Sequence, residues 1–218
     1  MLQYDKDQAL ISIHIPKCGG QSFIETLKTW YGEKLYLHYY NREEQKMPRQ
    51  YPLKPGICIH GHFNQKRQFG VEDYYPETKQ FITFLRDPFE IKVSNYFYGK
   101  KIAYQPLAKS GVFEKIEEYF EASMNSYMLN FFPKKVTLEN YQEIIDNNFV
   151  FIGILEDYQE SLMRLGKKLG FPTAELDQKN KTDRDPEIPD GLREKFMEEN
   201  PLDFAVYDYA CQLNSKLI

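Results

Sequence analysis

Short runs of apolar residues alternate along the chain with longer segments in which apolar residues recur every third or fourth position. The short runs are rich in β-branched and aromatic residues, as is typical of buried strands. We expect strands at residues 11–15, 56–60, 80–85 and 149–154. Because strands that alternate with helices favour parallel pairing, the pattern predicts an α/β fold. We expect a single domain over residues 1–218, with a central, mostly parallel sheet flanked by helices.

The periodic segments predict the helices. A helix over 22–31 has four apolar residues at helical spacing. Another begins at Pro88, with Asp87 as its N-cap, and Gly170 ends a third helix over 158–169. Shorter helices are expected on either side of residues 122–123, and at 141–147, 191–199 and 202–213. Polar or proline-rich connections, which we expect to be irregular, lie at 41–55, 104–111 and 172–189.

Polar side chains stand where three of the expected strands end. Lys17 follows the first strand, His60 ends the second and His62 follows it, and Arg86 follows the third. In a parallel α/β sheet the carboxyl ends of the strands share one edge, and ligands bind beyond that edge. We therefore expect these side chains to contribute to a single site.

The loop after the first strand has the features of an anion site. Pro16 ends the strand, and Gly19 and Gly20 let the backbone turn sharply and approach a ligand closely. A strand, a glycine-containing loop and a helix point free amides and a helix dipole at an anion, and Lys17 and Ser22 add a cation and a hydroxyl. The alternative is an ordinary βα turn that carries a lysine. The loop is not a Walker A sequence, because its lysine precedes the glycines.

A second anion site is indicated after the third strand. Arg86 offers a bidentate fork to a phosphate, and Ser94 lies eight residues further on, about two turns into the following helix. The alternative is that Arg86 pairs with Asp87 or with a carboxylate of the helix. Two anion sites together would suit a ligand with two separated phosphates.

The histidines are candidates for acid–base work. His60 and His62 flank a glycine at a strand end, where two imidazoles could face one cleft and take a proton near neutral pH. The alternatives are structural histidines, or a metal site with Cys58 that lacks a clear fourth ligand. His14 is expected to be a core histidine inside its strand. His38 lies in an aromatic segment that either lines a sugar site or forms a surface strand.

Composition narrows the classes of function. The formal net charge of −4 argues against coating a nucleic acid, so a basic site must be local. Three cysteines without CxxC spacing indicate a reducing compartment rather than a disulfide framework. No apolar run is long enough to span a bilayer, and the N-terminus has no apolar signal segment. These features predict a cytoplasmic protein, and the sequence carries no signal for its oligomeric state.

Two segments resemble a known enzyme family. Residues 14–22, His-Ile-Pro-Lys-Cys-Gly-Gly-Gln-Ser, and 84–96, Phe-Leu-Arg-Asp-Pro-Phe-Glu-Ile-Lys-Val-Ser-Asn-Tyr, are similar to the sulfotransferases that use 3′-phosphoadenosine 5′-phosphosulfate (PAPS). The resemblance is strongest to the carbohydrate-modifying branch that includes heparan sulfate 2-O-sulfotransferase. It covers most of the chain, including residues 153–158 and 180–182, and implies a P-loop-like phosphosulfate-binding loop after the first strand.

The resemblance implies a role for each matching position. The 3′-phosphate would be bound by Arg86 and Ser94, and a segment of Asn180, Lys181 and Thr182 would lie over the cofactor. The 5′-phosphosulfate would be bound by the loop after the first strand, at Lys17, Cys18, Gly19, Gly20, Gln21 and Ser22. Cys18 and Gln21 stand where the family has threonines. His62 would be the catalytic base, with His60 positioning the acceptor or sharing that role, and Lys17 would also stabilise charge on the leaving phosphate.

By resemblance the protein moves a sulfuryl group from PAPS to a hydroxyl, in line and without a metal, and releases PAP. The acceptor implied by the branch is a saccharide. Two rivals remain: a nucleotide kinase or NTPase with a related phosphate loop, for which Glu156 or Asp157 would hold Mg²⁺, and a PAP-binding module that has lost catalysis. The absence of GxxxxGK[ST] counts against the kinase, whereas the changes at Cys18 and Gln21 allow the inactive module.

Overall fold

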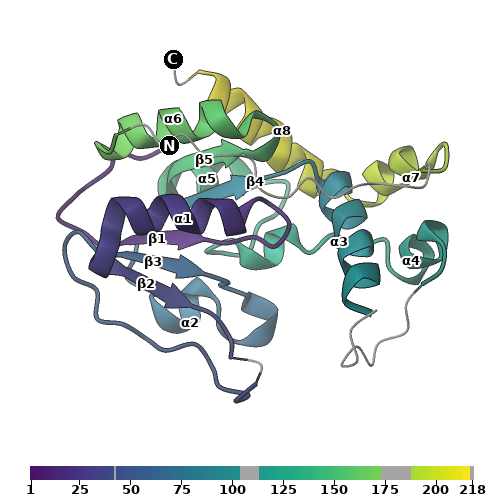
Figure 1. Ribbon diagram of the computed structural model, residues 1–218. Helices are drawn as coiled ribbons and strands as arrows, with labels where there is room; N and C mark the ends of the chain where they lie inside the picture. Colours follow the sequence, from purple (N-terminus) through teal and green to yellow (C-terminus); the bar gives the residue numbers. More distant parts are fainter. Residues whose placement is uncertain (42, 104–112, 173–187, 217–218) are drawn as a thin grey trace.

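The sheet has five parallel strands in the order β2-β3-β1-β4-β5, one strand more than the sequence predicts. The computed structural model describes residues 1–41, 43–103, 113–172 and 188–216. The strands are β1 Leu10–Ile13, β2 Leu35–His38, β3 Cys58–Gly61, β4 Phe81–Leu85 and β5 Phe149–Ile154. Every pairing is parallel, so the predicted α/β fold with a parallel sheet is confirmed (Figure 1).

The additional strand, β2, lies at the edge of the sheet beside β3. Its first three residues are partly or largely exposed, whereas β1, β3, β4 and β5 are buried throughout. A strand buried on both faces forms a continuous apolar run, but an edge strand does not have to. This difference explains why β2 gave a weaker signal. Of the two alternatives for this segment the structure has the strand, yet its last residue, His38, is fully buried.

The predicted helices are found within a few residues of their expected bounds. They are α1 Gly20–Tyr31, α3 Pro88–Ala103, α4 Ile116–Ala122, α5 Tyr141–Asn148, α6 Tyr158–Leu169, α7 Leu192–Glu199 and α8 Pro201–Ser215. The structure differs from these expectations in two places. The short helix α2, Val71–Tyr74, was not predicted, and after residue 123 the chain forms only a 3₁₀ turn, Met128–Phe131. The loop expected at 104–111 and most of the one at 172–189 lie outside the described residues.

Three apolar clusters hold the elements together. On one face of the sheet α1 and α6 pack through Phe23, Leu27 and Leu162. On the other face the cluster takes residues from α2, α5 and α8. The third cluster joins α3, α4 and α7, which extend past the carboxyl end of β4 (Figure 1). Within the described ranges, no helix is long and apolar enough to cross a membrane.

Candidate active site

The strand order brings together the three strand ends that carry the polar groups. β1 lies between β3 and β4, with Ile13 level with Gly61 on one side and with Thr83 on the other. The segments after these strands also touch. The amide of His14 donates to the Gly61 carbonyl at 2.7 Å, and Arg86 Nη1 lies 3.5 Å from the carbonyl oxygen of Lys17. The convergence expected from the sequence is therefore present.

The loop between β1 and α1 leaves the start of the helix uncapped. Lys17 and Gly19 have left-handed backbones, with φ of 70° and 81°, and the N-cap Gly19 has no side chain to bond the first turn. The Gly19 carbonyl accepts the amides of Ser22 and Phe23, at 3.0 and 3.1 Å. Within the part of the chain that the structure describes, the amides of Gly20 and Gln21 have no acceptor. They are available to an anion beyond the helix end.

Both glycines of the loop are required by their neighbours. A Cβ on Gly19 would lie 2.6 Å from Leu155 Cδ1, and its positive φ disfavours a side chain. A Cβ on Gly20 would lie only 2.0 Å from His14 Nε2. Packing against Leu155 and His14, and not only access for a ligand, therefore explains the glycine pair.

Cys18 differs from its predicted role. Its side chain is 2 % exposed and lies in the apolar cluster beneath the sheet edge. Its amide already donates to the Ile15 carbonyl at 3.3 Å, and its Sγ lies 3.8 Å from the Pro16 carbonyl. Burial raises the pKa of the thiol. Cys18 thus has neither amide nor side chain available for a ligand, and it supports the loop from below.

Lys17 is a half-buried cation without a carboxylate partner among the described residues. Its Nζ lies 4.1 Å from the centroid of the Tyr98 ring, a cation–π contact. Burial, followed by the charges of Arg86 and Lys101, lowers the pKa of Lys17. Repulsion of this kind is relieved when an anion binds between the cations.

Arg86 has the partner that the alternative interpretation gave it. Its Nη2 lies 3.1 Å from Glu90 Oε2, and its Nε lies 3.9 Å from Glu156 Oε1. Ser94 follows Glu90 by four residues, about one turn of α3, and is 7 % exposed. Glu90 therefore lies between the two residues predicted to bind one phosphate.

Asp87, the predicted N-cap, is part of a bridge that the sequence did not reveal. Its Oδ1 accepts the amide of Glu90 at 3.0 Å, as a cap does. Both of its oxygens also accept bonds from Arg193 of α7. The Asp87 amide donates to Glu156 Oε1 at 3.1 Å, while Tyr207 donates to Oε2 at 3.0 Å. The bridge spans more than 100 residues, so no local pattern could have indicated it.

His62 has a defined tautomer. Its Nδ1 lies 2.7 Å from the carbonyl oxygen of His14, which can only accept, so Nδ1 carries the proton and Nε2 is the basic nitrogen of the neutral ring. The ring is stacked on that of His14 at a centroid distance of 4.4 Å. His62 is partly exposed, as a base that meets an acceptor must be.

His60 is fully buried and does not reach the surface. Its Nδ1 lies 2.8 Å from Ser12 Oγ, and its Nε2 has no partner in the described structure. Burial, followed by the charge of His62, lowers the pKa of His60 to about 3. His60 has no exposed surface through which to touch an acceptor, and its expected role, positioning the acceptor or sharing the work of the base, stays a prediction. The ring stacks on that of His14 at a centroid distance of 5.4 Å, and His14 in turn stacks on the partly exposed His62.

His14 and Tyr39 belong to this group, although the sequence interpretation left both out of it. His14 lies just past β1 and is 8 % exposed, and its Nδ1 is 2.8 Å from the Tyr39 hydroxyl. Burial, followed by the charges of His62 and His60, lowers the pKa of His14 to about 2. The parallel register of β1 and β3 could have indicated its place, because it sets Ser12 level with His60.

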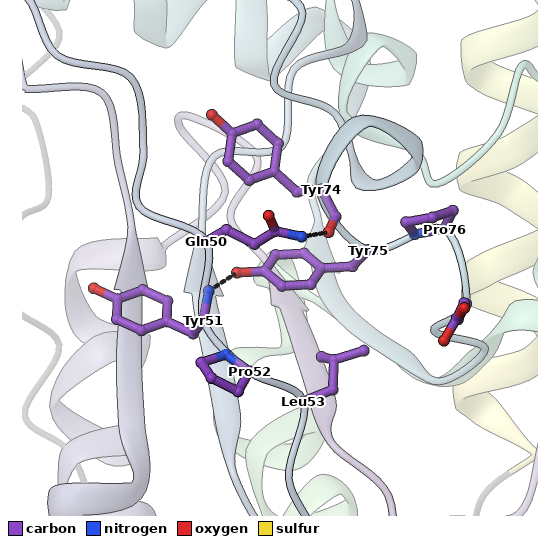
Figure 2. Close-up of a pocket in the computed structure, with 8 residues that line it drawn as sticks. Gln50, Tyr51, Pro52, Leu53, Tyr74, Tyr75 and Pro76 are labelled. Carbon is purple, nitrogen blue, oxygen red and sulfur yellow. Dashed lines mark hydrogen bonds between the residues drawn. The ribbon is translucent and has the colours of Figure 1, made fainter.

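A tyrosine-lined pocket of about 580 Å³ lies beside the edge strand β2. Tyr51, Tyr74 and Tyr75 line it (Figure 2), and the Tyr75 hydroxyl accepts the Tyr51 amide at 3.0 Å. The rings of Tyr74 and Tyr75 also contact the ring of His38, at 4.6 and 5.9 Å. The pocket is thus one strand away from His62, whose amide donates to the His38 carbonyl.

Two further predictions concern the segment over the cofactor and the absence of a metal. Asn180, Lys181 and Thr182 lie outside the described residues. Among the residues that are described, no three His, Cys, Asp or Glu side chains are grouped so as to hold a metal ion.

Comparison with known proteins gives the class. The profile of the sulfotransferase family matches residues 1–210, so the chain belongs to that family. No curated protein sequence matches it. Among solved structures, the chain is similar to a sulfotransferase from Alicyclobacillus acidocaldarius, with a TM-score of 0.52 and 15% identity over 92% of this chain and 94% of that one.

A second similar structure is mouse sulfotransferase SULT7A1 in complex with PAP, with a TM-score of 0.49 and 15% identity. The match covers 90% of this chain and 64% of the mouse chain, so our chain spans less than two thirds of that protein. At these identities the structural likeness concerns the fold alone.

Proposed function

We propose that this protein transfers a sulfuryl group from PAPS to a hydroxyl of an acceptor, and that the acceptor is a saccharide. Family membership supports the class of reaction, and the resemblance of residues 14–22 and 84–96 supports PAPS as the donor. PAPS supplies the sulfuryl group, and the residues of the chain bind it, orient it and move the proton of the acceptor.

The end of α1 would hold the phosphosulfate. The amides of Gly20 and Gln21 have no acceptor in the described structure, and the helix has no side-chain cap. Lys17 adds a cation that contacts the Tyr98 ring and has no carboxylate partner among the described residues. Because free amides and an unneutralised cation stabilise a bound anion, these groups fit the 5′ end of PAPS.

Arg86 and Ser94 would hold the 3′-phosphate. Glu90 now occupies Nη2 of Arg86, so a phosphate must share or replace that contact. A dianionic phosphate forms stronger charge-assisted bonds to a guanidinium than a part-exposed carboxylate does. Glu90 therefore competes with the phosphate for Arg86.

His62 would take the proton of the acceptor hydroxyl through Nε2. The bond from Nδ1 to the His14 carbonyl fixes this tautomer and the orientation of the ring. When Nε2 gains the proton, the new charge lies against the neutral ring of His14, and Lys17 stabilises charge on the leaving phosphate. His60 is a positioning residue behind this pair.

The tyrosine pocket supports a saccharide acceptor. Sugar rings present apolar faces that stack on aromatic side chains while their hydroxyls bond polar groups, and the pocket offers both, with Tyr51, Tyr74 and Gln50 in its wall (Figure 2). The pocket lies next to His38 of β2, and β3 and β1 separate β2 from β4, the strand that Arg86 follows.

A cytoplasmic location remains a prediction from the sequence.

The uncapped start of α1 beside Lys17 is the observation that carries the proposal. The test is calorimetry of PAP binding with and without Mg²⁺, followed by transfer of labelled sulfate from PAPS to a panel of glycans, lipids and phenols. We expect binding without Mg²⁺ and transfer to a glycan. Lys17→Ala should weaken PAP binding, whereas Lys28→Ala, on the exposed side of α1 and paired with Glu25, should not.

The same experiment separates the rivals. Strict dependence of binding on Mg²⁺ would favour a kinase, although Glu156 already accepts bonds from Asp87 and Tyr207. Binding of PAP without transfer to any class of acceptor would favour the inactive module. Absence of PAP binding would overturn the proposal.

A further inference from the structure

The Nε2 atom of His14 has no role in the proposed function. The Nε2 atom fills the space that a side chain at position 20 would need, because it lies 2.0 Å from where a Cβ on Gly20 would be. Because Cα–Cβ bonds in a helix tilt toward its N-terminus, this space lies at the end of α1 toward which the free amides of Gly20 and Gln21 point. His14 therefore reaches the start of the helix from the neighbouring strand end.

The hydrogen bond at the other nitrogen determines the tautomer of His14. The Tyr39 hydroxyl lies 2.8 Å from Nδ1. If the phenol donates to Nδ1, the phenol proton has an acceptor and the hydrogen of the ring is on Nε2, facing the start of α1 where a bound anion would accept it, whereas the reverse arrangement leaves the phenol proton without an acceptor in the described structure. Burial raises the pKa of the Tyr39 phenol, so it keeps its proton. The single N–H hydrogen of the neutral His14 ring is consequently on Nε2.

We propose that His14 is a ligand-binding residue whose Nε2–H donates to an oxygen of the anion held at the start of α1, beside the amides of Gly20 and Gln21. The inference rests on the proposed function, which supplies the ligand: the 5′-phosphosulfate of PAPS, or the 5′-phosphate of PAP. It makes the loop a mixed donor set, with two amides, one ammonium and one neutral imidazole.

A neutral imidazole suits this place. The burial of His14 and the two neighbouring imidazoles keep its pKa low, so the ring donates without adding a cation beside Lys17 and His62. A donor held by the bond to Tyr39 and by stacking on the rings of His60 and His62 loses little entropy on binding. It also explains why position 20 has no side chain.

The first measurement uses the native protein. Imidazole nitrogen NMR should show the Nε2–H tautomer for His14, and its Nε2 signal should shift when PAP is added. A spectrum with the Nδ1–H tautomer, or a His14 signal unchanged at saturating PAP, would overturn the inference. Tyr39→Phe keeps the ring but removes the phenol, so the Nδ1–H tautomer should appear and PAP binding should weaken by less than in a variant without the imidazole.

The second measurement compares variants. His14→Phe keeps an aromatic ring in the stack but has no donor, and should weaken PAP binding by about 10- to 100-fold, the range of one bond to a charged group. His14→Gln restores an N–H and should recover part of the loss. His38→Phe is the matched control: it also removes a fully buried imidazole, stacked on Phe63 away from α1, and should leave the PAP affinity within twofold.

The outcomes separate this inference from the proposed function. If the native protein does not bind PAP, the proposed function fails and His14 loses its ligand. If the native protein binds PAP and a folded His14→Phe variant binds it equally well, only the role of His14 fails. Equal losses in His14→Phe and His38→Phe would show a general effect of buried imidazoles and would also overturn it.

Discussion

The two halves of the carboxyl edge of the sheet differ in charge: one half contains cations, and the other contains neutral imidazoles. Beyond β1 and β4, the side chains of Lys17 and Arg86 lie close enough to repel each other, and of the two only Arg86 has carboxylate contacts among the described residues, with Glu90 and Glu156. On the side of β2 and β3, the rings of His14, His38 and His60 are buried and stacked on neighbouring rings, His14 on His60 and His62, and His38 on Phe63.

This difference shows how one edge can serve two chemical tasks. Cations that are not fully neutralised by carboxylates are suited to binding an anionic sulfuryl donor. Their mutual repulsion is relieved when the anion binds. Burial keeps the rings of His14, His38 and His60 neutral, whereas the partly exposed His62 is the ring proposed to accept a proton. The comparison can be tested by changing either half, and the following predictions run from the largest expected effect to the smallest.

Acid should destabilise the protein through the histidine half. The pKa values of His14, His38 and His60 are lowered to about 2, 4 and 3, so below the unfolded value of about 6.5 the unfolded chain takes up protons that the folded protein does not. Each histidine then removes about 1.4 kcal/mol of stability per pH unit, on the order of 6 kcal/mol for all three between pH 6.5 and 5.

Urea unfolding measured from pH 8 to pH 5 checks this effect. The stability should be nearly constant above pH 7 and should fall steeply below 6.5. In His38→Phe the slope below pH 6.5 should decrease by about 1.4 kcal/mol per pH unit. A flat profile down to pH 5 would mean that the imidazoles are not kept neutral by the fold.

His62→Ala should reduce kcat by about 10²–10⁴-fold, because it removes the base. The PAP affinity of the folded variant should stay within about threefold, since the imidazole acts on the acceptor and not on the phosphates. Turnover with a saturating glycan acceptor, alongside calorimetry with PAP, measures the two effects. Native turnover in this variant would assign the proton to another group.

Arg86→Ala should weaken PAP binding by about 1.5–3 kcal/mol, the range for charge-assisted bonds. Calorimetry at low and moderate salt measures it, with Lys28→Ala as the control for loss of a surface cation. If both Arg86→Ala and Lys17→Ala bind PAP as the native protein does, the cationic half is not the donor site.

Glu90→Gln should have the smallest effect and the opposite sign. The amide keeps the size of the side chain but releases Nη2 of Arg86 from its ion pair. We expect PAP binding to become stronger by about 0.5–1 kcal/mol, as the competing pair is partly exposed. Weaker binding would show that Glu90 positions Arg86 for the ligand instead of competing with it.

The sequence by itself determined the elements whose signal is local. Continuous apolar runs predicted the four fully buried strands, and Gly170, Asp87 and Pro88 marked helix ends through their backbone preferences. The parallel arrangement then placed Lys17, His62 and Arg86 at one edge, because strands in such a sheet end on the same side.

Only the tertiary structure decided which groups are available and which are already engaged. The side chains of Cys18 and His60 are buried in the core, and contacts between residues distant in the chain pair Asp87 with Arg193 and His14 with Tyr39. The position of His14 against Gly20 depends on the packing of α1 over the sheet. Such facts come from long-range packing and from desolvation, neither of which leaves a periodic or local pattern in the sequence.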